Sequence, residues 1–109
     1  CPIWLNEGLA QIFEKNREDL PEIPEVYFEY DEKLQSIDEG FKSSPNRITA
    51  IKLYKLSFST TCKLINEYGW NSVAEVLRLL SIGKSFEEAS SEVFGESKET
   101  IESRIIAYR

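Results

Sequence analysis

Histidine and methionine are both absent from this sequence of 109 residues. Histidine is the commonest metal ligand and general base in proteins, so its absence excludes any site that this chain would build on imidazole alone. The absence of methionine, an initial one included, leads us to expect an excerpt from a longer protein. The two cysteines, Cys1 and Cys62, do not make a disulfide framework, and we expect Cys62 to be a small core residue.

The chain is also short of positive charge and of long apolar runs. It has 13 Lys and Arg against 19 Asp and Glu, with a net charge of −6 and a pI near 4.7. This balance argues against nucleic acid or an anionic membrane surface as the main partner. No apolar run approaches the length of a membrane span. Because 41% of the residues are hydrophobic, we expect one domain with a compact core, residues 1–109.

Apolar residues at helical spacing predict an all-α fold of five or six helices around a long central helix. Helices are expected over residues 2–15, 31–41 and 47–68, followed by three short ones. The expected caps of these short helices are Ser72, Ser85 and Ser97, and the expected glycine stops are Gly69, Gly83 and Gly95.

The region over residues 16–46 is expected to be an irregular connection that contains the short helix near residues 31–41. Pro21 and Pro24 favour extended backbone in its first part. Residues 26–30 are therefore a candidate for one short strand.

The central helix over residues 47–68 is expected to bury about half of its circumference, which implies several packing neighbours. The inward positions are Ala50, Ile51, Leu53, Tyr54, Ser57, Phe58, Thr61, Cys62, Leu64, Ile65 and Tyr68. The outward positions are Lys52, Lys55, Ser59, Lys63 and Glu67.

The first helix has two sides that are partly apolar, which is typical of a helix sandwiched between neighbours. Its core stripe consists of Leu5, Gly8, Leu9, Ile12 and Phe13, and the roughly opposite side carries Ile3, Glu7, Ala10 and Glu14. The chain supplies a neighbour for one side. For the Ile3/Ala10 side two outcomes stay open, self-association through that side or a bend of the helix that covers it.

The string WLNEGLA, with the proline before it, resembles the second zinc motif of the gluzincin metallopeptidases, which belong to the peptidase MA-like group. That motif is often written P-x-W-L-x-E-G-x-A, and the matching residues here are Pro2, Trp4, Leu5, Glu7, Gly8 and Ala10. The resemblance continues in order through LYKLS, LINEYGW, LLSIGKSFEEA and FGESKETIE, at 53–57, 64–70, 79–89 and 94–102. It therefore covers nearly the whole chain and implies a C-terminal helical subdomain of such a peptidase.

The resemblance implies that Glu7 is the third zinc ligand of a complete protein, where two histidines would complete the set and water would take the fourth position. Gly8 and Ala10 would then let a second helix approach closely. Tyr54 is either a core residue, as its helical position favours, or a group that stabilises an oxyanion. Glu14 is either a solvated acid or an acid that orients the metal site. For Glu7 itself, the alternative is an ordinary structural acid.

The HExxH motif that supplies the two histidines in this family is absent from the chain. We therefore expect this chain to be inert and to bind no zinc by itself. Its expected partners are an upstream segment of the same protein that bears HExxH and, in the complete protein, a peptide substrate. The other open function is a non-catalytic helical interaction module from a degenerate peptidase-like protein.

Overall fold

The computed structural model describes residues 1–14, 28, 32–43 and 45–106, and within these ranges the chain forms six α-helices. They are α1 (Ile3–Glu14), α2 (Leu34–Lys42), α3 (Arg47–Tyr68), α4 (Trp70–Ser81), α5 (Phe86–Phe94) and α6 (Lys98–Ile105). The predicted all-α class is confirmed, and so is the short helix near residues 31–41. None of these helices is long and apolar enough to cross a membrane.

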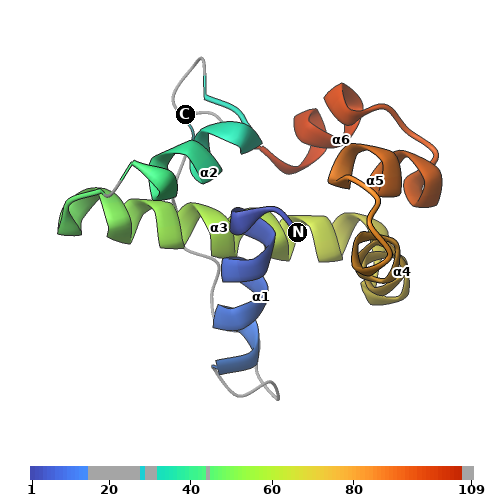
Figure 1. Cartoon of the computed structure of the whole chain (residues 1–109), viewed down its shortest axis with the longest axis horizontal. Coiled ribbons are helices and arrows are strands. Elements are labelled where there is room, and N and C mark those ends of the chain that lie inside the picture. The colour runs from blue at the N-terminus through green and yellow to red at the C-terminus, as the bar shows by residue number, and fades with distance from the viewer. Residues whose placement is uncertain (15–27, 29–31, 44, 107–109) are drawn as a thin grey trace.

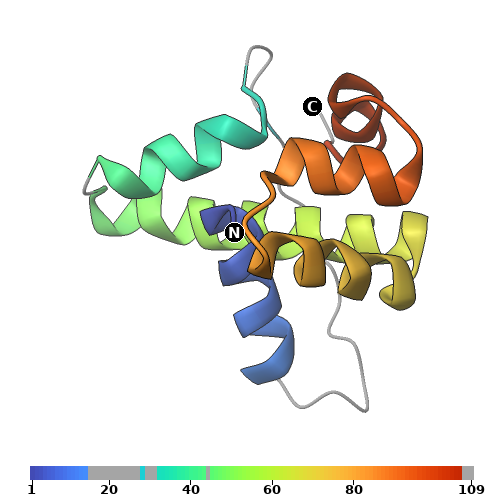
Figure 2. The same cartoon turned by 45° about the vertical axis from the view of Figure 1, so that its right-hand side comes forward.

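The 22-residue helix α3 lies at the centre of the fold, as the sequence predicts. Helices α1, α2, α4 and α6 all pack against it, and α1 runs across it (Figure 1). Helix α5 packs between α4 and α6 and completes that side of the domain (Figure 2). The main core cluster draws apolar side chains from α1, α2, α3, α4 and α6, and it includes Phe28.

The buried surface of α3 differs from the prediction. Residues 56–62 are all buried, so the middle of the helix is covered on every side, including Ser59, which was expected to face outward. Toward the beginning of the helix, Ile51 and Tyr54 are 46% and 44% exposed, although both were expected to face inward. The reason is that the neighbouring helices surround the middle of α3, and spacing along one helix cannot show where those neighbours stop.

Local capping chemistry sets several helix ends where the sequence predicts them. The Ser85 side chain forms a capping box with Glu88, and the Ser97 side chain accepts from the Thr100 amide. Gly95 ends α5 in the left-handed region, with φ 71°. These residues work because Ser oxygens pair with free amides and glycine adopts positive φ without strain.

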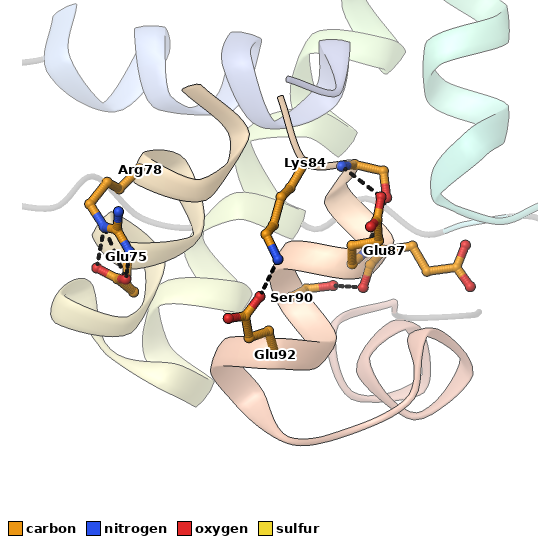
Figure 3. Close-up of polar contacts among 8 residues, drawn as sticks. Glu75, Arg78, Lys84, Glu87, Ser90 and Glu92 are labelled. Carbon is orange, nitrogen blue, oxygen red and sulfur yellow. Dashed lines mark hydrogen bonds and ion pairs between the residues drawn. The ribbon is translucent and has the colours of Figure 1, made fainter. Parts of the chain in front are cut away.

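One predicted boundary is wrong. Helix α4 begins at Trp70, directly after Gly69, so Ser72 lies inside the helix and caps nothing. Glu75, three residues after Ser72, pairs with Arg78 (Figure 3). This pair holds the pKa of the Glu75 carboxyl below its ordinary value. The last helix ends at Ile105.

Two further predictions concern single residues of the core. Of the candidate strand at residues 26–30, the structure describes only Phe28, which is buried, and the rest lies outside the described residues. Cys62 is buried beside Ile12 and Phe58, as expected for a small core residue. Burial raises the pKa of its thiol, which keeps the sulfur protonated and unreactive.

Candidate functional site

The candidate site is built on α1, the helix that carries Glu7. No side chain of residues 1–2 caps this helix, and its first free amides are satisfied from another helix. The amides of Ile3 and Trp4 donate to Asp38 Oδ2 and Oδ1 of α2 at 3.0 and 2.9 Å. A carboxylate at a helix N-terminus pairs with free amides and with the positive end of the helix dipole. Asp38 therefore fixes the first turn of α1, one turn before Glu7.

The middle of α1 is fixed by a very close approach to α3 at Gly8. A Cβ atom placed at Gly8 would lie 2.6 Å from both the Ser57 carbonyl oxygen and Thr61 Cβ. Ser57 is fully buried, and its hydroxyl donates to the Leu53 carbonyl at 2.8 Å, which confirms it as a helix-packing residue. Gly8 thus lets a second helix approach closely, as expected, and that helix belongs to this chain. Its close neighbour is α3, because Gly8 lies on the buried stripe of α1.

A single amide side chain joins Glu7 to the helix beneath it. Gln11 Nε2 donates to the Tyr54 carbonyl at 2.8 Å and to the Glu7 carbonyl at 3.4 Å. The two predicted functional residues, Glu7 and Tyr54, are thus linked through their backbones at the crossing of α1 and α3. This link gives the Glu7 side of α1 a defined position over the first half of α3.

The side of α1 that carries Glu7 is much more exposed than the side that carries Gly8. Ile3 and Glu7 are partly exposed, and Ala10 and Glu14 are exposed. Trp4, Leu5, Leu9 and Ile12 on the other side are all less than 10% exposed. The expected second neighbour of α1 is therefore not among the described residues, and α1 does not cover Ala10 by bending.

The side chains of the other two predicted site residues, Tyr54 and Glu14, have different surroundings from that of Glu7. Tyr54 is half-exposed, which corrects its expected place in the core, and its ring packs on that of Phe41 with centroids 5.2 Å apart. Its half-exposed phenol remains within reach of solvent. Glu14 lies at the end of α1, two turns from Glu7, so the two carboxylates are separated by about 10 Å along the axis. Helix α1 thus does not bring them together.

The donor atoms of the described residues do not make a metal centre. No group of three or more Cys, Asp or Glu side chains in this part of the chain could hold an ion, and the sequence has no His. A catalytic zinc needs three protein ligands, so Glu7 alone does not fit the requirement. A partly exposed carboxylate on an open helix side is compatible with one ligand of a set completed by other residues.

Two important residues were missed by the sequence reasoning. Asp38 acts on a helix that begins 35 residues earlier, so no local pattern connects them. The one hint in the sequence is that Pro2, the residue directly before α1, has no side-chain oxygen to cap the helix, so a cap has to come from elsewhere. The second is Glu102 of α6, which is 9% exposed and whose Oε1 atom is buried without a hydrogen-bond partner in the described structure. Burial raises the pKa of its carboxyl.

Comparison of the chain with protein-family models, with curated proteins and with solved structures finds no match.

Proposed function

We propose that this chain is the C-terminal helical portion of a gluzincin-type zinc metallopeptidase, which hydrolyses peptide bonds as a complete protein. The proposal starts from the ordered motif resemblance that begins at WLNEGLA. The observation that carries it further is the arrangement of α1. Its Gly8 side is held tightly on α3, and its Glu7 side is left open. A third-ligand helix needs this arrangement, because its carboxylate must be rigidly held and still face a second helix.

In the proposed site, each residue of this chain has a limited task. Glu7 contributes one carboxylate ligand, and Asp38, Gly8 and Gln11 hold the backbone of its helix in place. A zinc ion, when bound, would polarise the scissile carbonyl and activate water. The Tyr54 phenol would donate a hydrogen bond to the developing oxyanion. Glu14 would act from outside the ligand set, by orienting neighbouring groups.

The test uses the protein expressed from its gene with whatever sequence lies upstream of Cys1. We expect that sequence to contain HExxH, and the purified protein to contain one zinc per chain by metal analysis and to cleave peptides. Glu7→Gln should lower the zinc content, whereas Glu14→Gln should leave it near one. Tyr54→Phe should keep the zinc and lower kcat by about a hundredfold with little change in KM. An upstream sequence without HExxH would overturn the proposal.

A second candidate is a non-catalytic helical interaction module, and exposed apolar side chains favour it. Ile48 and Ile51 on the first half of α3 are 82% and 46% exposed, and Phe13 is 55% exposed. Large apolar side chains exposed to water are typical of contact surfaces. Self-association through the Ile3/Ala10 side would show as concentration-dependent sedimentation of this chain that Ala10→Arg abolishes. A monomer at all concentrations would leave such a module dependent on a different protein.

A further inference from the structure

A pocket of about 190 Å³ lies where the beginning of α1 meets α2, α5 and α6. It is separate from the open side of α1 that carries Glu7, and nothing in the proposed peptidase function uses it. Trp4, Leu34 and Phe86 provide most of its apolar wall. The rings of Trp4 and Phe86 meet edge to face, with centroids 5.4 Å apart. Such a wall suits an apolar stem, and aromatic rings also attract cations.

The polar groups around this pocket carry an excess of negative charge. Glu102, Glu87 and Asp38 contribute three carboxylates, and Lys98 contributes one ammonium group. The oxygens of Asp38 already accept two backbone amides. The Glu87 side chain extends from α5 on the side of α2 (Figure 3). The lining is therefore complementary in charge to a cation, and Glu102 and Glu87 are the acids available to meet it.

Glu102 gives an independent reason to expect a ligand. Its side chain lines the pocket and is more than nine-tenths buried, yet its Oε1 atom meets no donor among the described residues. A buried carboxylate oxygen without a donor is destabilising, and native proteins rarely keep one without a purpose. If the Glu102 side chain turns toward a ligand in the pocket, an N–H group of that ligand would supply the missing hydrogen bond and offset the cost of burying the charge.

We propose that this pocket binds a basic side chain of a peptide ligand, with its apolar stem against Trp4 and Phe86 and its cationic head at Glu102. The volume matches a single side chain and is too small for a drug-sized ligand. The proposal does not depend on zinc or on catalysis, so it stands or falls separately from the peptidase function.

The charges that surround Glu102 predict how binding responds to pH. Lys98 and Glu99 lie on its own helix, Glu87 faces it from α5, and Lys33 faces it from the residue before α2. Burial raises the pKa of Glu102, so the carboxyl binds its proton at a higher pH than an exposed glutamate does. A cation binds the ionised form better, so the affinity should increase as pH rises through that pKa and should then level off.

The fluorescence of Trp4 provides a direct test. In the Trp70→Phe variant of the full 109-residue chain, Trp4 is the only tryptophan, and it lines the pocket. Butylguanidinium, which has the shape of an arginine side chain, should change this fluorescence saturably at pH 7. Butylurea, its neutral isostere, should bind at least tenfold more weakly, because it has no positive charge to form an ion pair with the Glu102 carboxylate.

Two matched variants on α6 then separate the pocket from the general negative charge of the chain. Glu102→Gln should weaken butylguanidinium binding at least tenfold, whereas Glu99→Gln, which makes the same charge change outside the pocket, should leave it unchanged. Equal binding of butylguanidinium and butylurea would overturn the proposal without any variant at Glu102. Equal effects of the two glutamate substitutions would also overturn it.

Discussion

Gly8 of α1 lies directly against Thr61 of α3, so closely that no side-chain carbon fits between the two helices. The hydroxyl of Thr61 is buried there without a hydrogen-bond partner among the described residues. At this crossing the two helix backbones are in close contact, and the Thr61 hydroxyl is left without a hydrogen bond. This contact decides the distance of α1, and therefore of Glu7, from the centre of the fold.

The first prediction concerns Gly8→Ala. Helix propensity alone would make this change stabilising by about 1 kcal/mol, since glycine is a poor helix former. We expect the opposite sign, a loss of about 1–3 kcal/mol in the free energy of unfolding, because the new methyl group would meet the Ser57 carbonyl oxygen. Urea unfolding followed by circular dichroism measures the change. Asn6→Ala, on an exposed position of the same helix, is the control and should change stability little.

The second prediction concerns Asp38→Ala. Removal of both carboxylate oxygens leaves the amides of Ile3 and Trp4 without their partner, so we expect a loss of about 1–2 kcal/mol. Amide hydrogen exchange should show faster exchange in the first turn of α1 before other helices are affected. Glu39→Ala removes a neighbouring acid that accepts a hydrogen bond from exposed Gln35, and it should cost far less. Equal losses for the two variants would show that Asp38 does not cap α1.

The third prediction concerns pH and Glu102. The folded state raises the pKa of this carboxyl above its unfolded value, so the folded chain binds the proton more tightly than the unfolded chain. Its contribution to stability is therefore fully present below the unfolded pKa and is lost as pH rises through the raised pKa. Glu102→Gln should be more stable than the parent at pH 7 and about equal to it near pH 4. Unfolding of both proteins at a series of pH values measures this, and a stability difference that does not change with pH would contradict the prediction.

The fourth prediction concerns zinc and this chain alone. Glu7 is a single carboxylate, and the described residues offer no set of ligands around it. Isothermal titration with zinc should therefore show no stoichiometric binding at submicromolar concentration. Tight binding that Glu7→Gln abolishes would contradict the view that the remaining ligands come from a different segment. Tight binding that Glu7→Gln leaves intact would point to donors elsewhere in the chain.

The helices could be predicted where the signals are local. Ser85 and Ser97 cap the helices that follow them, because a cap needs only the next three residues. The burial of Ser59 and the exposure of Tyr54 could not be predicted, since both depend on where other helices cross α3. The cap that Asp38 forms is non-local for the same reason. Glu7 was singled out by family resemblance alone, and its partial exposure would not have distinguished it from other helix acids.

The attachment of α1 has a consequence for the covalent chain between α1 and α2. Asp38, Gly8 and Gln11 hold α1 through contacts with α2 and α3, and none of these contacts involves the residues that join Glu14 to Leu34. The orientation of α1 is thus set by its contacts with α2 and α3 rather than by the length of the segment that joins α1 to α2. Changes in the length of that connection are expected to leave Glu7 in place, provided that Phe28 stays in the core cluster that it shares with Trp4, Leu5 and Leu9.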